Sequence, residues 1–176
     1  TGSYGFLGLG CILALLNQIL YIFRTKENGK RITLDINELT YIAEMTITVG
    51  LFMLTIGTFL GGIWANESWG RYWGWDPKET WALVSVLVYS IILHFRFIPG
   101  LSSKFAFNVA SFWGYSAILF TFFGVNFYLV GLHSYAQGEG LAVIPNWIFY
   151  TVYIFILFTL ISFIRFKMYG KSLKEN

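Results

Sequence analysis

Aromatic side chains gather with unusual density in one short, polar stretch of the sequence. Five tryptophans and a tyrosine fall within residues 64–81, which read WANESWGRYWGWDPKETW. Tryptophan and tyrosine favour the headgroup region of a membrane, and such a belt accounts for the two outermost tryptophans. It accounts poorly for Trp69, Trp73 and Trp75, which crowd together with glycines between them. Flat rings at this density indicate a binding surface for a planar, apolar ligand of large area, because burial against aromatic faces is favourable.

The two histidines of the chain offer ligands for a metal. His133 follows the fourth apolar stretch, where a lone histidine is usually a solvated side chain; beside an aromatic surface, a neutral imidazole instead suits axial ligation of haem iron. His94 lies roughly 14 residues into the third apolar stretch, about 21 Å from its start, and shares a helix face with Ser90. An ionisable residue inside a membrane helix indicates function, with a hydrogen-bonded interfacial histidine as the alternative.

The segment Asp76-Pro77-Lys78-Glu79 has the pattern of a helix start. Asp76 suits the N-cap, Pro77 the first helical position, and Glu79 the third, from which its side chain reaches back to the cap. We therefore assign Asp76 a structural role first and any functional role in addition. The cap fixes the angle between the aromatic loop and the helix, and a rigid loop presents its aromatic faces in a fixed direction.

The elements that position these residues are membrane helices. Hydrophobic residues make up 56% of the chain and charged residues only 12%, about half the charged share of a soluble domain. Lipid offers no partners to free backbone groups, so each apolar window of roughly 17–25 residues must be helical. The sequence predicts an all-α, polytopic membrane bundle of about five transmembrane helices, near residues 4–23, 41–63, 80–98, 105–130 and 147–166.

The basic residues predict the orientation of this bundle, a single membrane domain over residues 1–176. Ten of the twelve lie on one side: between the first and second windows, between the third and fourth, and after the fifth. By the positive-inside rule that side is cytoplasmic, so the N-terminus lies outside and the C-terminus in the cytoplasm. The loops at residues 64–79 and 131–145 then face outward. Topology explains this pattern better than a basic patch for nucleic acid, and we expect membrane lipid but no nucleic acid as a partner.

Smaller signals refine the predicted bundle. Gly57 and Gly61 form a small-residue pattern that predicts close helix packing. Asp35 and Glu38 are spaced as a capping pair before the second helix, which places Glu44 at its inner, interfacial end. The single cysteine rules out an internal disulfide. The first residue is threonine, and we expect the chain to be a piece of a longer protein.

The aromatic stretch resembles the tryptophan-rich WWD signature of haem-handling membrane proteins, W-G-x-x-W-x-W-D, over residues 69–76. The continuation PKETWAL, the sequence LHFR around His94, and the segments GIWANE, GVNF and GLHSY resemble the CcsA/ResC branch of that family. The resemblance covers approximately residues 37–136. It is specific, because the long signature and both histidine contexts agree.

This resemblance implies a role that composition does not show. CcsA-type proteins act with a CcsB/ResB-type partner, sometimes fused in one chain, as a cytochrome c synthase, and they present haem outward to an apocytochrome c bearing C-x-x-C-H. The implied cofactor is haem b, and the implied location is the plasma (inner) membrane with a periplasmic active face, or the thylakoid membrane in a plastid. The residues implied in haem binding are His133 and His94 as iron ligands, with Trp69, Trp73, Trp75 and Asp76 in the binding loop.

The implied reaction adds two cysteine thiols across the haem vinyl groups. The attacking thiols belong to the apocytochrome, so we expect no catalytic nucleophile in this chain, while Arg71 or Lys78 is expected to pair with a haem propionate. The second histidine of each iron-ligand pair is not in this sequence. Three alternatives are a CcmC-like chaperone that passes haem on without attaching it, a transporter that does not handle haem, and a structural subunit. The continuation after the signature argues against the first, and the apolar helices argue against the second.

Overall fold

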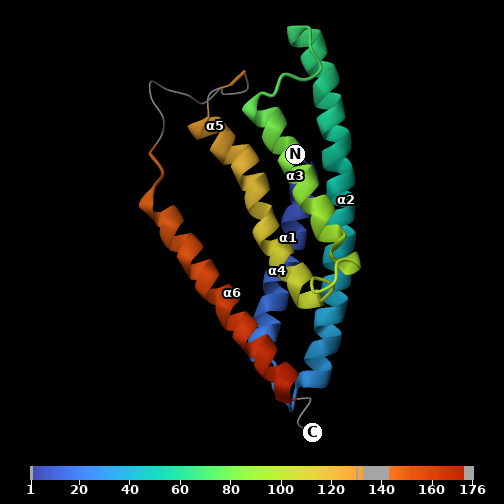
Figure 1. Cartoon of the computed structure of the whole chain (residues 1–176), viewed down its shortest axis with the longest axis vertical. Coiled ribbons are helices and arrows are strands. Elements are labelled where there is room, and N and C mark those ends of the chain that lie inside the picture. Colours follow the sequence, from blue (N-terminus) through green and yellow to red (C-terminus); the bar gives the residue numbers. More distant parts are fainter. Residues whose placement is uncertain (1, 130, 133–142, 173–176) are drawn as a thin grey trace.

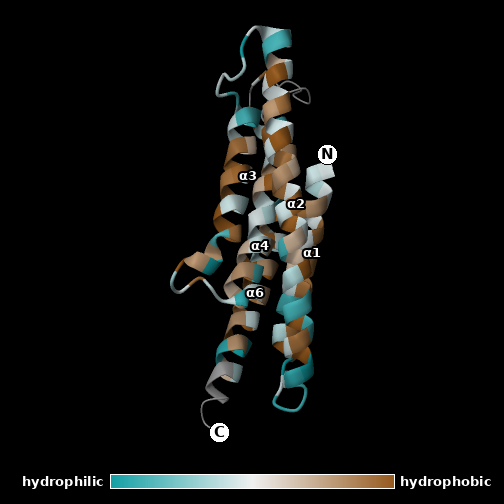
Figure 2. Cartoon of the chain, turned by 90° about the vertical axis from the view of Figure 1, so that its right-hand side faces the viewer, coloured by the Kyte–Doolittle hydropathy of each residue, from teal (hydrophilic) through white to brown (hydrophobic). Residues whose placement is uncertain are grey.

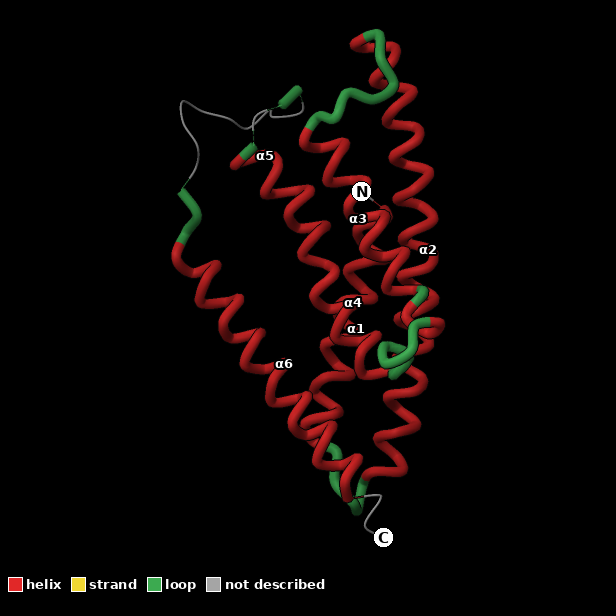
Figure 3. Tube along the Cα trace, viewed as in Figure 1, coloured by secondary structure: helices red, strands yellow, loops and turns green. Residues whose placement is uncertain are grey.

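The apolar windows fold into helices that run side by side (Figure 1). The computed structural model describes residues 2–129, 131–132 and 143–172, and every regular element in that part of the chain is a helix (Figure 3). The elements are α1 (Gly2–Phe23), α2 (Gly29–Trp69), α3 (Pro77–Leu93), the 3-10 turn η1 (Phe95–Phe97), α4 (Lys104–Leu119), the π-helical turn η2 (Phe120–Gly124), α5 (Val125–Tyr128) and α6 (Asn146–Ser172). The predicted all-α class is confirmed.

Helix length and composition make the molecule a polytopic membrane protein. Four continuous helical stretches are long and apolar enough to cross a membrane: α1, α2, residues 104–128 and residues 146–169. α3 has 17 residues and is about 26 Å long, slightly less than the roughly 30 Å of a hydrocarbon core. Figure 2 shows hydrophobic residues along most of each helix. Four or five spans agree with the number that the sequence predicts.

α2 is longer at both ends than the apolar window inside it. It begins at Gly29 and ends at Trp69, and its 41 residues make it about 60 Å long. Asp35 and Glu38 therefore lie inside the helix, and their prediction as a helix-start capping pair is wrong. This polar first part stays helical because Ile36, 2% exposed, packs in a buried cluster with aromatic side chains of α1 and α4.

α1 packs against α2, α4 and α6, and a buried cluster of polar side chains joins three of these helices. Asn17 of α1 donates through Nδ2 to Thr40 Oγ1 of α2 at 3.1 Å and to Asn108 Oδ1 of α4 at 2.8 Å. Asn108 in turn donates to Thr40 Oγ1 at 2.8 Å. Gln18, next to this cluster in sequence, is fully buried, and its amide atoms have no partner among the described residues. Hydrogen bonds of this kind fix helix pairing in lipid, where water cannot replace them.

The glycines that bring helices together are not the predicted ones. Gly57 and Gly61 form the small-residue pattern in α2, yet a Cβ at either would meet no described atom within 4 Å. The predicted close packing at these two glycines is therefore not found among the described residues. Gly10 of α1 and Gly50 of α2 take that role instead, because each lies directly against an apolar side chain of the other helix. Gly57 and Gly61 leave an open surface on the part of α2 that leads to the aromatic loop.

The α1–α2 turn meets the end of α6 at one end of the bundle (Figure 1), and basic side chains of both segments make contacts there. Arg165 of α6 donates from Nε to the backbone carbonyl of Ile22 at 2.9 Å. The Arg24 guanidinium lies 3.8 Å from the centre of the Tyr169 ring. Two of the three basic segments thus come together in space, and the loop between α2 and α3 lies at the opposite end of the molecule (Figure 3).

Candidate functional site

The aromatic loop is shorter than the sequence predicted. α2 continues to Trp69 and ends at Gly70, whose left-handed backbone (φ 71°) lets its N–H donate to the Asn66 carbonyl at 2.8 Å. α3 begins at Pro77, so only residues 70–76 are non-helical. The predicted loop boundary at Trp64 is therefore wrong. The reason is local: Ala65, Asn66 and the residues around them continue the helical turn until glycine permits the chain to leave it.

The tryptophan rings form two perpendicular pairs and not one flat surface. Trp64 and Trp69, on the last turns of α2, lie edge to face with centroids 5.1 Å apart. Trp73 and Trp75, in the loop, lie edge to face at 5.7 Å and 90°. Trp75 is 70% exposed and has a positive φ of 58°, which is uncommon for a residue with a side chain. Such a conformation persists only where the surrounding structure imposes it.

Two acidic side chains, Glu79 and Asp76, hold the loop in the conformation that gives Trp75 its positive φ. Glu79 Oε2 accepts from the backbone N–H of Gly74 at 2.8 Å and from that of Asp76 at 3.2 Å. Asp76 Oδ2 accepts from the Lys78 N–H at 3.2 Å and completes the capping box at the start of α3. The Arg71 guanidinium fills the space where a Cβ on Gly74 would stand, so the loop also folds closely upon itself. The predicted cap is confirmed in full.

Asp76 also reaches across the molecule. Its Oδ1 accepts from the backbone N–H of Leu132 at 2.6 Å, which joins the aromatic loop to the segment after α5. A Cβ on Gly131 would collide with the same carboxylate oxygen and would come within 2.8 Å of Pro77. Asp76 is 7% exposed, so this contact is shielded from water. One buried carboxylate therefore holds both predicted outward loops together.

A cavity of about 390 Å³ lies beneath the loop, between the first residues of α1, the second half of α2 and the start of α3. Its walls are largely apolar and aromatic, and four rings line it: Tyr4, Trp64, Tyr72 and Trp73. Lys78 and Glu79 supply charge at the α3 side. The open surface at Gly57 and Gly61 forms another part of the wall.

Of the three tryptophans predicted to bind the ligand, only one lines the cavity. Trp73 lines the cavity, whereas Trp69 and Trp75 do not belong to its lining. Trp64 and Tyr72, which the sequence analysis did not assign to the site, do line it. Their signal in the sequence was their position: Trp64 lies one helical turn beyond the Gly57–Gly61 pattern, and Tyr72 directly precedes Trp73.

Lys78 lies between the cavity and α5. Its Nζ donates to Asn126 Oδ1 of α5 at 3.1 Å, directly after the π-helical turn η2. Asn126 in turn donates to the Phe122 carbonyl at 2.6 Å, a backbone group of that turn. π-helical turns often occur at functional sites. The ammonium group is thus held in place at the edge of the cavity.

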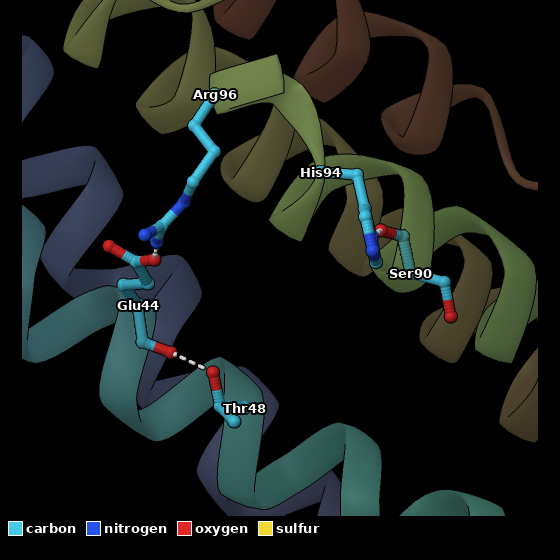
Figure 4. A network of polar contacts seen from close by, with 5 residues as sticks. All are labelled: Glu44, Thr48, Ser90, His94 and Arg96. Atoms are coloured by element: carbon cyan, nitrogen blue, oxygen red, sulfur yellow. Dashed lines mark hydrogen bonds and ion pairs between the residues drawn. The ribbon is translucent and has the colours of Figure 1, made fainter. Parts of the chain in front are cut away.

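His94 lies at the opposite end of α3 from the aromatic loop, as the sequence predicts, and forms the C-cap of that helix. Its ring Nδ1 lies 2.6 Å from the Ser90 carbonyl oxygen. Because a carbonyl oxygen only accepts, Nδ1 carries the proton and Nε2 of the neutral ring keeps a free lone pair. The side chain is exposed, and Figure 4 shows the ring beside Ser90 on α3. A histidine in this tautomer is suited to bind a metal through Nε2.

Glu44 and Arg96 form an ion pair near this histidine (Figure 4). Glu44 lies 15 residues after the start of α2, so its prediction at the inner end of the helix is wrong; the cause is the unexpected length of α2. His133 lies outside the described residues. Among residues 2–129, 131–132 and 143–172, no three histidine, cysteine or acidic side chains come together as a metal site.

Comparison with known proteins places the chain in a family. A family model described as "Cytochrome C assembly protein" matches residues 1–133. Protein NrfI of Wolinella succinogenes is 51% identical over 143 residues, which are 80% of this chain and 16% of NrfI. The cytochrome c biogenesis protein CcsA of Chlamydomonas reinhardtii is 41% identical over 133 residues, 76% of this chain and 37% of CcsA. CcsA of Synechococcus sp. (strain WH7803) is 47% identical over 98 residues, 56% of this chain and 30% of CcsA.

These matches define a class of membrane proteins that serve cytochrome c biogenesis. The chain belongs to the cytochrome c assembly protein family. The resemblance to the CcsA branch, which the sequence motifs indicate, is confirmed by these relatives. The chain spans well under half the length of the curated relatives it matches, at 16% of NrfI and 37% of the algal CcsA.

Proposed function

We propose that this chain is the haem-presenting part of a cytochrome c synthase, which holds haem b at its outward face for covalent attachment to apocytochrome c. The observation that carries the proposal is the bond from Asp76 to the Leu132 N–H, because it joins the tryptophan-rich loop to the residue directly before His133. A cavity lined by aromatic rings and an imidazole ligand both suit haem binding. Membership in the cytochrome c assembly family supports the same conclusion.

Each residue of the site has a distinct role in this proposal. Trp73 contributes apolar wall, Trp69 and Trp75 brace the neighbouring rings edge to face, and His133 ligates the iron. Asp76 holds the two loops at a fixed separation. The cationic side chains at the loop, Arg71 and Lys78, are available for the haem propionates, and Lys78 lines the cavity.

The chemistry requires orientation more than activation. Each cysteine S–H adds across a vinyl C=C bond, so that a C–S bond forms, the hydrogen goes to the other vinyl carbon, and no oxidant is consumed. Both nucleophiles come from the C-x-x-C-H segment of the apocytochrome. The protein contributes by holding haem with its vinyl edge accessible, which replaces a random encounter by an oriented one.

The inner histidine extends the proposal across the membrane. His94, with Nε2 free, is suited to ligate haem on its way from the cytoplasmic side. The second ligand at each site and the docking surface for the apocytochrome come from a CcsB/ResB-type partner or from further residues of a longer chain. The distribution of basic residues supports an outward site in the plasma membrane or, in a plastid, the thylakoid membrane.

Purification of the full-length protein from membranes tests the proposal. The visible spectrum is recorded for the unchanged protein, for His133→Ala and for His94→Ala, and covalent haem is measured on an apocytochrome c substrate. We expect His133→Ala to lose the outward haem and the thioether product, and His94→Ala to reduce delivery of haem to that site. Haem spectra that neither substitution changes would refute the ligand assignment. Bound haem without any thioether product would favour the chaperone instead.

A further inference from the structure

We propose that the Glu44–Arg96 ion pair positions His94. The pair holds the inner end of α3 against α2, so that the imidazole faces the haem iron in a fixed orientation. The inference rests on the proposed role of His94 as a haem ligand and assigns a function to two residues that the proposal above does not use. Both side chains are visible beside His94 in Figure 4.

The turn of α3 before His94 is anchored by Ile92, which is 4% exposed and packs in a buried cluster, but His94 itself lies outside that cluster. As the C-cap of α3, His94 donates its backbone N–H to the Ile91 carbonyl at 3.0 Å, and its ring bonds to Ser90. Both contacts exist only while the last turn of α3 stays wound, and helix ends tend to fray. α3 also has no basic residue in its last turn to stabilise the carbonyl groups there. Because His94 is exposed and ends the helix, the orientation of its ring also depends on what holds the residues that follow it.

Two side-chain contacts hold those residues to α2. Arg96, in η1, pairs with Glu44, and Lys104, at the start of α4, donates from Nζ to Asn37 Oδ1 at 2.6 Å. Glu44 and Asn37 are seven residues apart, or about 10 Å along α2, so the contacts fix the connection between α3 and α4 at two separate points. The second point lies further from His94 in sequence.

Between these two points the connection packs loosely on α2. A cavity of about 190 Å³ lies there, lined by Glu44, Arg96 and Lys104 among others. Its lining also includes Leu93, Phe95, Leu101 and Phe107, so the two polar contacts add fixed points to an otherwise apolar attachment. The side chains of Arg96 and Glu44 are 56% and 29% exposed, so the pair fixes position more than it adds stability. A charge without a partner is costly beside lipid, which favours the closed pair.

The test isolates the inner haem by using the full-length protein with His133→Ala. In that background we expect Glu44→Gln and Arg96→Gln each to lower the haem-to-protein ratio about fivefold, the lower end of typical coupling between sites. The haem that remains should show the spectrum of iron that has lost a histidine ligand. Partial unfolding alone would lower the amount of haem without changing its spectrum. Exchange of the charges, Glu44→Arg with Arg96→Glu, should restore both readouts.

Glu38→Gln is the matched control, because Glu38 is an exposed carboxylate on the same helix and should leave the haem unchanged. If His94→Ala abolishes the inner haem while Glu44→Gln and Arg96→Gln retain it, the positioning role is refuted and the ligand role stands. If His94→Ala itself changes nothing, the ligand role fails separately. If the single variants are too unstable to purify, the variant with exchanged charges tests the inference alone. The inference is refuted if that variant binds no inner haem, or binds it with an altered spectrum.

Discussion

At the scale of single residues, the candidate site depends on carboxylates that serve two partners each. Glu79 holds two backbone N–H groups of the aromatic loop through one oxygen. Asp76 uses its two oxygens separately: Oδ2 caps α3, and Oδ1 accepts from Leu132. An aspartate that only capped a helix would tolerate replacement by any good capping residue. Asp76 does more, and its second role can be tested apart from the first.

Asp76→Asn separates these roles. Asparagine is a good N-cap, so α3 should keep its start, but the amide NH₂ group would face the Leu132 N–H, and two donors repel each other. We expect the outward haem to bind about tenfold more weakly, because a hydrogen bond to a charged acceptor contributes roughly 1.5–3 kcal/mol. Haem titration measures the affinity, and circular dichroism checks that helix content is unchanged. Equal affinity in both proteins would show that the bond to Leu132 is dispensable.

Gly131→Ala tests the same contact from the other side. The added methyl group would collide with the Asp76 carboxylate, so either the bond breaks or the segment after α5 moves away. We expect the melting temperature in detergent to fall by several degrees, corresponding to about 1–2 kcal/mol of destabilisation. Gly57→Ala is the control, since a methyl group there meets no described atom within 4 Å. Similar melting temperatures for both variants would contradict the close approach.

At the scale of elements, the sequence predicted where helices exist but not where they end. Apolar windows are visible because lipid requires them, whereas the first turns of α2 are polar and look like a connector. Those turns are helical because Ile36 packs into a buried cluster, a tertiary contact that no local pattern reveals. The start of α3 was predicted correctly, because the capping box from Asp76 to Glu79 is entirely local.

The buried polar cluster gives a prediction about how these helices pair. Asn108→Leu removes the bonds to Asn17 and Thr40 and leaves one N–H of the buried Asn17 amide without its acceptor, so we expect the unfolding free energy to fall by about 1–2 kcal/mol. Gln18→Leu is the matched variant, because Gln18 is equally buried and its amide atoms have no described partner. It should be neutral or stabilising. Thermal unfolding in detergent measures both, and a larger loss for Gln18→Leu would contradict the assignment.

At the scale of the whole molecule, the candidate site was only partly visible in the sequence. Local density identified Trp73, and capping chemistry identified Asp76. The bond from Asp76 to Leu132 connects residues 56 positions apart, and Trp64 joins the cavity wall only because α2 continues past its apolar window. Contacts of this kind follow from how helices are placed in space, and a single sequence does not encode them in any local pattern.

The orientation of the molecule is itself testable. We expect a cysteine introduced at Tyr72 to react with a membrane-impermeant thiol reagent in intact cells, and one introduced at Lys30 to react only after the cells are opened. Both variants carry Cys11→Ser, so that the introduced thiol is the only one in this sequence. Tyr72 and Lys30 are both exposed, which makes the comparison fair. Labelling of Lys30 in intact cells would reverse the assigned topology.

The unusual length of α2 has a mechanical consequence. One uninterrupted helix runs from the basic end of the molecule past Glu44 to Trp69. Glu44 and Trp69 are separated by about 37 Å along this helix. If the contact with Arg96 serves as a fulcrum, a rotation of α2 by about 5° moves its aromatic tip by about 3 Å, by the geometry of a rigid rod of that length. A small tilt of α2 about this contact is thus amplified at Trp64 and Trp69, at the far end of the helix.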